Sequence, residues 1–475
     1  MLALSGCASM APQAEQSPEV EVPIAWSAAE ISGGGGTLSL TRWWQRFDDT
    51  VLDTLVTQAL QSNTSVETAQ SVLQQARAMR DLAAAALWPT LTGSASAQHS
   101  RAGNNSGSNF QAGVNGNWIP DVFGANRSAL DAGVATVDAR YASVGDTQVA
   151  ISAEVGLSYI LLRSAQARLN IAADNLASQQ ETLQLTQWRQ QAGLVTELEA
   201  EQARAAVEQT RALLPALQIS IAQTGHALAV LTGQPPEALS SLLAASRPVP
   251  QAKDDPALGI PAETLRQRAD VRAAEYLVNA ARARVAQADA ARFPGFALGG
   301  TLGLSAASVG ALSNGAALVS SLLASVTLPI FDGGAAVAQV RSQQAALEQA
   351  RIAYHATILN ALKEVEDALV ALHNDRQRLL SLRNAADAAG NAALMARQRF
   401  SSGLVDFQVV LETQRAQFAT QDSVASASAD LSSDFVRLFK ALGGGWSPAT
   451  TSTAMAPVAG SAPAYPDHTS RTSTP

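Results

Sequence analysis

The chain has 475 residues, enough for two or three domains or for one large elongated domain. Its net charge of −8, with no basic stripe in the sequence, argues against a nucleic-acid-binding protein. Hydrophobic residues make up 47% of the chain, which excludes wholesale disorder, and charged residues make up only 15%, against roughly 25% in ordinary soluble proteins. This composition favours closely packed helices and water-lined surfaces.

The sequence contains no run of 18 or more apolar residues, so we do not expect a membrane-spanning helix. The nearest candidate, from Ala316 to Phe331, is interrupted by Ser, Thr and Pro. A membrane role must therefore come from a β-barrel or a lipid anchor.

Cys7 is the only cysteine, which excludes an internal disulfide and a cysteine-based metal cluster. It ends the sequence Leu4-Ser5-Gly6-Cys7, which follows an apolar stretch typical of the end of a signal peptide. The pattern is similar to a bacterial lipobox, in which the cysteine becomes the first residue and carries lipid. The next residue is Ala8 and not Asp, which would resemble an inner-membrane retention signal, so the outer membrane is implied. We expect residues 1–7 to be a signal-peptide remnant and Cys7 to be the lipidated residue; the alternative is a free thiol in a disordered start.

Internal repetition indicates two tandem copies of one structural unit. Several motifs recur in the same order 210 residues later: Glu154-Val155, Leu162, Arg168-Leu169 and Gly193-Leu194-Val195 reappear as Glu364-Val365, Leu372, Arg378-Leu379 and Gly403-Leu404-Val405. The predicted copies cover residues 51–231 and 262–446. Residues 8–50 precede them, a Pro/Ser/Gly-rich linker (232–261) joins them, and a disordered tail (447–475) follows.

Each copy is predicted to contain a helix, a β-hairpin, a very long helix, a glycine turn and a second long helix. The first helices are expected at residues 52–87 and 262–292, the hairpins at 90–119 and 296–331, and the turns at 193 and 403. The long helix from Asn126 to Gln191 would measure about 100 Å. Apolar residues recur every seven positions, which predicts left-handed supercoiling against neighbouring helices: Val155, Leu162, Leu169, Leu176 and Leu183 in the first copy, and Ile358, Val365, Leu372 and Leu379 in the second.

Four segments of about ten residues alternate between apolar and uncharged polar side chains, as transmembrane strands do. One of them places Phe110, Val114 and Trp118 on a single face. A half-buried sheet of a soluble domain would also alternate, but the Gly/Asn/Ser-rich tips at Arg101–Asn109 and Ser305–Ala316 favour membrane hairpins. Four strands cannot close a barrel alone, so the barrel must be shared: two chains would give eight strands and three would give twelve.

No catalytic constellation emerges from the sequence, and no enzyme is predicted. The histidines are scattered, without a carboxylate at metal-ligand spacing, so neither a metal nor another cofactor is expected apart from lipid on Cys7. The glycine run Gly33–Gly36 lacks the lysine of a phosphate loop.

The whole pattern resembles the outer membrane factor family, the TolC/OprM-like efflux ducts, and within it the NodT-type lipoproteins. Besides the features above, the likeness rests on Trp43-Trp44, on the run from Arg266 to Glu275, and on Leu438 to Trp446. The resemblance implies a mainly α fold with a membrane β-barrel: a homotrimer sharing a twelve-stranded barrel and a long periplasmic α-helical barrel. It also implies an equatorial belt, docking of a periplasmic adaptor at the helix tips, and an inner-membrane pump of the RND type.

The resemblance places the functional residues at the two turns. Those expected to dock the adaptor are Gly193, Leu194, Gly403 and Leu404, and those expected at the channel constriction are Glu197, Glu201, Asp406, Phe407 and Glu412. Three-fold symmetry would turn an inward carboxylate into an acidic ring. The alternative is a solvated helix start with carboxylates favoured by the helix dipole. Phe407 is either an apolar plug or a core residue, and Val409 stands where some family members carry a second acid.

The expected function is that of a passive outer-membrane exit duct for drugs or other small solutes in a tripartite efflux system. A type I protein-secretion duct remains an alternative within the same fold. A periplasmic coiled-coil adaptor without a pore is an alternative from another class, and it would contain one helical hairpin instead of a duplicated unit.

Overall fold

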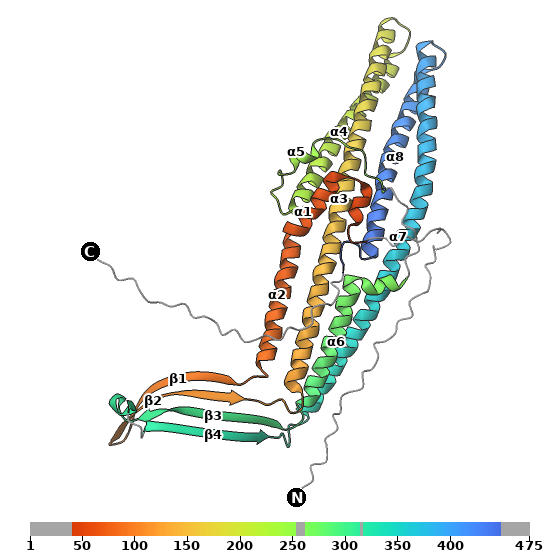
Figure 1. Cartoon of the computed structure of the whole chain (residues 1–475). Coiled ribbons are helices and arrows are strands. Elements are labelled where there is room, and N and C mark those ends of the chain that lie inside the picture. The colour runs from red at the N-terminus through yellow and green to blue at the C-terminus, as the bar shows by residue number, and fades with distance from the viewer. Residues whose placement is uncertain (1–39, 253–261, 314–316, 448–475) are drawn as a thin grey trace, which may run out of the picture.

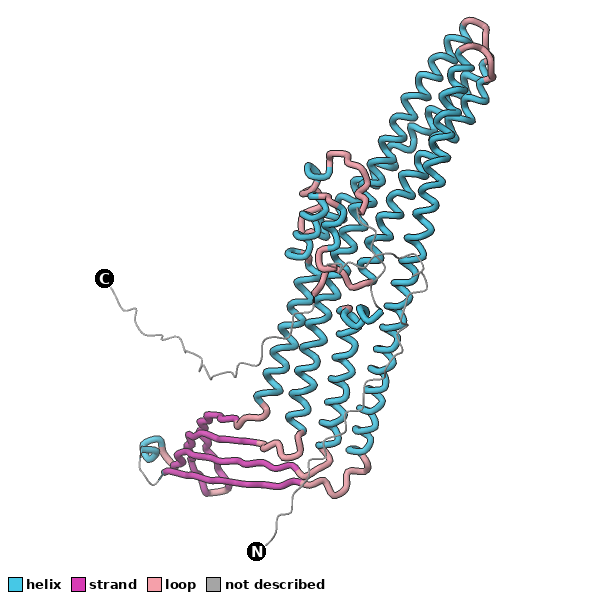
Figure 2. Tube along the Cα trace, turned by 45° about the vertical axis from the view of Figure 1, so that its right-hand side comes forward, coloured by secondary structure: helices cyan, strands magenta, loops and turns pink. Residues whose placement is uncertain are grey.

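The computed structural model describes residues 40–252, 262–313 and 317–447. Cys7, the predicted signal-peptide remnant, most of the N-terminal segment and residues 448–475 of the predicted tail lie outside these ranges. The molecule is elongated, with a β-sheet at one end and two helical hairpin tips at the other (Figure 1). Figure 2 shows that helices form the whole shaft and that strands occur only at the sheet end.

The two copies match in the lengths of their helices. α2 (Thr64–Ala85) and α6 (Ala269–Ala290) have 22 residues each, α3 (Ala125–Gln191) and α7 (Ala335–Ser401) have 67, and α4 (Glu197–Leu231) and α8 (Phe407–Ala441) have 35. The repetition in the sequence is thus a repetition of structure. α3 and α7 run nearly the full length of the shaft, the shorter helices pack beside them, and the sheet joins the two copies (Figure 1).

The prediction of one continuous helix from Leu52 to Leu87 is wrong. α1 (Thr50–Ser62) and α2 are separated by Asn63, whose backbone is extended. The Asn63 side chain accepts a hydrogen bond from the Ser65 amide and donates one to the Leu231 carbonyl at the end of α4. An asparagine that caps two helix ends at once is more stable at a break than inside a helix.

The second copy breaks at the equivalent place. The predicted helix 262–292 consists of a 3₁₀ turn (Ala262–Gln267) followed by α6, and Arg268 stands between them. Arg268 donates to the Ala441 carbonyl at the end of α8, as Asn63 does at the end of α4. In both copies the residue before the helix on the sheet side (α2 or α6) therefore caps the end of the helix on the tip side (α4 or α8).

The strands form one antiparallel sheet in the order β1 (Thr90–Ala102), β2 (Asn105–Trp118), β3 (Gly295–Ala306) and β4 (Leu318–Thr327). The register brings the apolar residues of the four strands to one face of the sheet. Leu91 lies opposite Gly116, Gly116 opposite Gly300, and Gly300 opposite Leu322. A hydrogen bond between the Thr301 and Ser321 hydroxyls lies on the polar face. Val319 and Leu323 also lie on that face, so the alternation in β4 is imperfect.

The first hairpin tip is shorter than the loop predicted at Arg101–Asn109. β1 and β2 pair as far as Ala102 and Asn105, so the connection is only two residues, Gly103 and Asn104. Gly103 has a φ of 62°, the left-handed conformation that tight hairpin turns need. In the second hairpin a 3₁₀ turn (Val309–Ser313) follows β3.

The main core lies at the middle of the shaft, where the first helical segments pack against α3 and α8. The 3₁₀ turn Trp43–Phe47 is buried there, and the Trp43 ring stacks on Phe439 at 5.7 Å between centroids. The short helix α5 (Ser240–Leu243) of the linker lies beside α4 near the middle of the shaft (Figure 1). This core ties the start of the described chain to the end of α8.

The seven-residue stripe of the second copy is buried along its whole length: Ile358, Val365, Leu372 and Leu379 are all core residues. In the first copy Val155 and Leu162 are buried, but towards the tip the fully buried positions of α3 are polar, including Gln179, Thr182 and Thr186. Leu183 itself is half-buried and packs against a small core between the helices of the tips.

One helix among the described residues, α4, is long and apolar enough to cross a bilayer if only length and composition are considered. α4 packs against α3 in the helical hairpin far from the sheet (Figure 1). Its first turn carries Glu197 and Glu199. We therefore assign α4 to the helical shaft.

Candidate functional site

The two hairpin tips are built by the same backbone motif. At the end of α3, the Leu194 amide donates to the Arg189 carbonyl at 2.8 Å and the Gly193 amide donates to the Gln190 carbonyl at 2.9 Å. The second tip repeats both bonds through Leu404 and Gly403, with the same distances. Both glycines have φ near 70°, and this left-handed residue ends each helix and reverses the chain. Leu194 and Leu404 are left exposed, at 69% and 74%.

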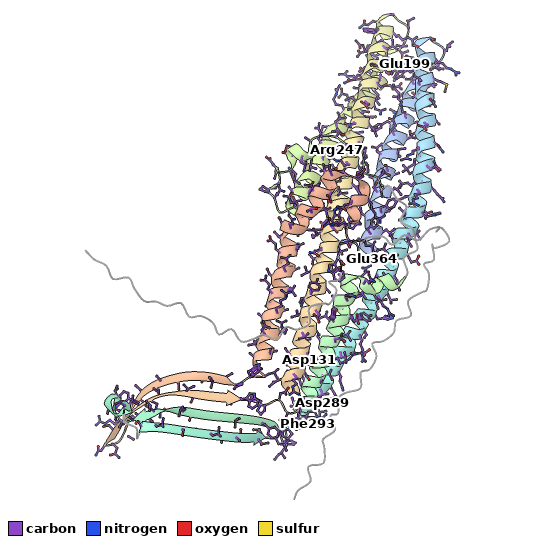
Figure 3. The ribbon with its side chains drawn as sticks, in the orientation of Figure 1. Asp131, Glu199, Arg247, Asp289, Phe293 and Glu364 are labelled. Atoms are coloured by element: carbon purple, nitrogen blue, oxygen red, sulfur yellow. The ribbon has the colours of Figure 1, made fainter. Side chains whose placement is uncertain are left out.

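The acids of the first tip begin α4. The Thr196 amide donates to the Glu199 carboxylate at 2.7 Å, which closes the start of the helix as a capping box. Glu197 is exposed in the first turn, where the helix dipole favours a negative charge. Glu201 is exposed and forms an ion pair with Arg204 one turn later. Figure 3 places Glu199 at the extreme end of the shaft.

The acids of the second tip begin α8. Asp406 is the residue before the helix, and its carbonyl accepts a hydrogen bond from the Val409 amide. Glu412 lies one and a half turns further on, is exposed, and accepts a hydrogen bond from Gln408 at 3.0 Å. These carboxylates are solvated in the single chain and available to face a partner or a pore.

Phe407 is 1% exposed and contacts Phe400, with 5.8 Å between the ring centroids. Ala203, Ala206 and Val410 complete this small core between the helices of the tips. In this structure Phe407 therefore packs inside the chain. It holds the start of α8 against the end of α7 and so positions Asp406 and Glu412.

Arg189 links the two tips. Its guanidinium donates to the Phe400 carbonyl at 2.9 Å and lies 4.5 Å from the centroid of the Phe400 ring. The end of α3 is thereby joined to the end of α7. The tips of the two copies thus lie side by side, as the cartoon also shows (Figure 1).

A line of polar contacts between α3 and α8 was not predicted from the sequence. Arg168 forms two hydrogen bonds with Asp422, at 2.7 and 3.1 Å. Nearer the tip, Asn175 donates to Gln421 at 3.0 Å and Gln414 donates to Thr182 at 2.9 Å. We call these three pairs the polar seam. Its signal in the sequence is the occurrence of Asn and Thr at helix positions where a coiled coil would carry Leu.

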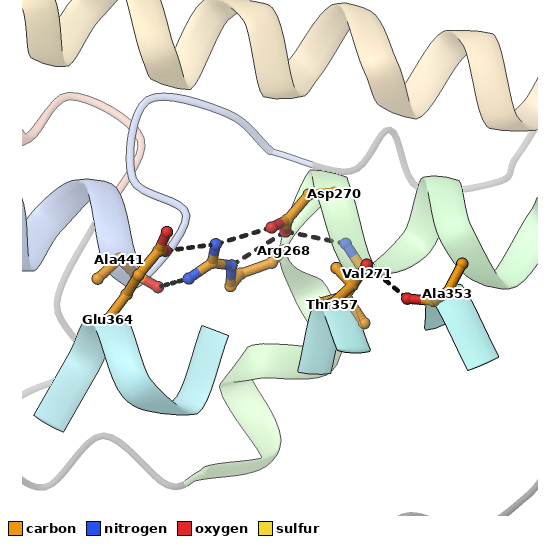
Figure 4. A network of polar contacts seen from close by, with 7 residues as sticks. All are labelled: Arg268, Asp270, Val271, Ala353, Thr357, Glu364 and Ala441. Carbon is orange, nitrogen blue, oxygen red and sulfur yellow. Dashed lines mark hydrogen bonds and ion pairs between the residues drawn. The ribbon is translucent and has the colours of Figure 1, made fainter. Parts of the chain in front are cut away.

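A second polar cluster joins three helices at the middle of the shaft (Figure 4). Arg268, 8% exposed, donates to Asp270, to Glu364 of α7 and to the Ala441 carbonyl. Burial lowers the pKa of the Arg268 guanidinium, but its bonds to both carboxylates outweigh burial and raise the pKa overall. Burial, followed by the nearby Asp270 charge, raises the pKa of the Asp146 carboxyl beside the cluster.

Within the described ranges no group of three or more His, Cys, Asp or Glu side chains is placed to hold a metal ion. The acids at the tips are separated and solvated, so they suit electrostatic attraction better than coordination.

A model of the family described as outer membrane efflux protein matches residues 55–234 and 260–444. Outer membrane protein OprJ of Pseudomonas aeruginosa is 32% identical over 453 residues, which cover 93% of this chain and 94% of OprJ. Nodulation protein T of Rhizobium leguminosarum biovar viciae is 30% identical over 431 residues, covering 90% of this chain and 89% of the relative.

Among solved structures, the outer-membrane channel OprN superimposes with a TM-score of 0.84 and 33% sequence identity, covering 91% of this chain and 99% of OprN. Both copies of the repeat, the sheet and the hairpin tips fall inside the matched region. The chain therefore belongs to the outer membrane efflux protein family and is an outer-membrane efflux channel protein that extends into the periplasm.

Proposed function

We propose that this chain is the passive exit duct of a tripartite efflux system and carries drugs or other small solutes from the periplasm to the exterior. The duct performs no chemistry of its own. A periplasmic adaptor connects it to an inner-membrane pump of the RND type, and the pump supplies the energy.

The observation that carries the proposal is a four-stranded sheet without a core. All residues of β1 and β4 are exposed, including large apolar side chains such as Leu322 at 80% and Val326 at 64%. A sheet with an apolar face and open edges is unstable in water, and it is stable in a bilayer only when its edges are paired. Three chains joined edge to edge supply twelve strands, which leaves an open, water-filled lumen.

The helices support the same head-to-tail assembly. Helix contacts run in the order α2, α3, α6, α7 near the sheet, and α4, α3, α8, α7 near the tips, so α7 forms one edge of the array. α7 exposes Ile352, Leu359, Leu380 and Leu394, which share one position of a seven-residue repeat. Such a stripe is suited to contact the α2/α4 edge of the next chain, and a rotation that closes after three copies gives a trimer.

The tips supply a gate and a docking site. Asp406, Glu412, Glu197 and Glu201 are solvated near the narrow end, and repetition by three would concentrate their charge around the axis. The polar seam holds α8 against α3 through hydrogen bonds, which can exchange with water when the helices separate. The exposed Leu194 and Leu404 offer apolar contacts to the adaptor. Lipid on Cys7 anchors the chain in the outer membrane.

Planar-bilayer recordings test the proposal. The purified chain is expected to give small, mostly closed conductances, and Glu412→Gln is expected to raise the open probability because it removes charge at the constriction. Glu208→Gln, an exposed acid further along α4 that pairs with Arg211, serves as the control and should leave the recordings unchanged. A chain that inserts but never conducts would contradict the duct.

A further inference from the structure

The four helices next to the sheet line an open hollow of about 600 Å³. Residues of α2, α3, α6 and α7 all line it, although α2 and α7 are at opposite edges of the array. Edge helices can share one hollow only if the array curves around it, so the hollow lies on the concave side. Figure 3 shows the same level of the shaft, where Asp131 and Asp289 are labelled close to the sheet.

The hollow is lined by positively charged and neutral side chains only. Arg140 of α3 and Arg284 of α6 contribute the charge, and among the described lining residues there is no Asp or Glu. Four glutamines add amide donors: Gln75, Gln287, Gln339 and Gln343. Val72 and Met79 of α2 contribute an apolar wall. Neither arginine takes part in an ion pair within the part of the chain that the structure describes.

Helix periodicity keeps the acids of this region away from the hollow. α3 lines it through Ala129, Gly133, Thr136 and Arg140, which lie on one face. Asp131 and Asp138 each follow a lining residue by two positions, a rotation of about 200° around the helix. Asp81 of α2 stands in the same relation to Met79 and forms an ion pair with Arg80. The hollow is therefore cationic although the chain as a whole carries a net charge of −8.

We propose that this hollow is a binding site for amphipathic organic anions, with the anionic group held by Arg140 and Arg284 and the apolar part against Val72 and Met79. A guanidinium binds carboxylate, sulfonate or phosphate through paired N–H donors, and a volume of about 600 Å³ is within the range of small-molecule sites. That the site faces the lumen rests on the proposed trimeric duct. That it binds anions does not, because a single chain supplies every lining residue.

Fluorescence titration of the detergent-solubilised full chain with 1-pyrenesulfonate, and with 1-pyrenemethanol as the neutral counterpart, tests the site. Arg140→Gln/Arg284→Gln is expected to weaken pyrenesulfonate binding at least tenfold and to leave pyrenemethanol binding unchanged. Arg140→Lys/Arg284→Lys keeps both charges but removes the paired guanidinium donors, so its affinity for pyrenesulfonate should fall between that of the wild type and that of Arg140→Gln/Arg284→Gln. Added salt should weaken only the anionic probe.

Arg77→Gln/Arg341→Gln is the matched control. It removes two exposed arginines from α2 and α7 at the same level, each two positions from a lining residue and so turned away from the hollow. The control should bind pyrenesulfonate as the wild type does. Equal affinity of the wild type and Arg140→Gln/Arg284→Gln, or an equal loss in the control, would overturn the proposal.

Bilayer recordings separate this inference from the proposed duct. If the chain conducts, pyrenesulfonate should reduce the current of the wild type and not that of Arg140→Gln/Arg284→Gln; a reduction of the same size in both would contradict the lumenal placement. If the chain never conducts, the duct fails while the titration still decides whether the site exists.

Discussion

Two glycines illustrate how differently single residues constrain this fold. Gly193 and Gly233 both have φ near 70° and both end a helix. A Cβ at Gly193 would meet nothing within 4 Å, whereas a Cβ at Gly233 would lie 2.2 Å from the Ser62 carbonyl oxygen. The first glycine is required only for its backbone conformation, and the second also for the close approach of α4 to the break between α1 and α2.

We therefore predict unequal costs for the same substitution. Gly193→Ala should lower the free energy of unfolding by about 1 kcal/mol, the cost of a left-handed residue with a side chain. Gly233→Ala should cost more than about 3 kcal/mol, because the backbone of Ser62 must also move. Melting of the detergent-solubilised chain would show the order, and equal melting temperatures would contradict the close contact at Gly233.

Asp434 of α8 is a buried carboxyl whose charge depends on the fold. It is 1% exposed, close to Asp375 of α7, and bonded to Arg437 at 2.8 Å. Burial first, and then the Asp375 carboxyl, raise the pKa of Asp434 from 3.8 to about 6, although Arg437 lowers it. Asp375 also forms an ion pair with Arg378 of α7, which pairs in turn with Asp430 of α8. The contact between α7 and α8 is therefore more stable when one proton is shared between the Asp434 and Asp375 carboxyls.

A raised carboxyl pKa fixes the sign of the pH dependence. The folded chain binds this proton more tightly than the unfolded chain, so the contribution of Asp434 to stability is largest below about pH 4, falls as the pH rises to about 6, and is level above. The fall is on the order of 2–3 kcal/mol. Asp434→Asn should remove it, which melting temperatures from pH 4 to 7.5 would detect. Asp387→Asn, which changes an exposed acid of α7 about three turns from Asp375, should retain it.

At the scale of elements, the long helices and the strands were predicted well because each rests on a local period, and the duplication because motifs recur in the same order 210 residues apart. The helix breaks at Asn63 and Arg268 were missed, since their cause is a carbonyl at the end of another helix that is distant in the sequence. The polar seam was missed for the same reason. At the tips, sequence identified exposed acids, but which of them face the pore depends on neighbouring chains.

The polar seam is expected to control how easily the tips separate. Asp422→Ala removes both bonds to Arg168, a partly exposed pair worth up to about 1 kcal/mol, and a trimer would lose three such pairs. The open probability in bilayers should rise at least about fivefold. Arg168→Ala/Asp422→Ala should add little to the single change, because both residues serve the same contact.

An ion pair within one helix provides the control for the seam. Lys363 and Asp367 of α7 form an exposed pair four residues apart and do not join two helices. Asp367→Asn should therefore leave the open probability unchanged. If it opens the channel as much as Asp422→Ala does, loss of surface charge and not separation of α3 from α8 is the cause.

For the whole molecule, the sheet determines the assembly. A single chain can neither pair the backbone hydrogen-bonding groups at the edges of the sheet nor bury its apolar face. The two faces should respond in opposite ways to the same charge. Leu322→Arg puts a cation on the apolar face and is expected to cost about 2–4 kcal/mol near the bilayer midplane, whereas Ser321→Arg points into the proposed lumen.

Membrane fractionation and mass measurement of the detergent-extracted oligomer test this together. The wild type and Ser321→Arg should be recovered from the outer membrane at three times the mass of the 49.2 kDa chain, and Leu322→Arg should be depleted from it. Equal recovery of the two variants would mean that the apolar face does not contact lipid. A mass of two chains would contradict the trimer, because an eight-stranded barrel has its interior filled by side chains and could not serve as a duct.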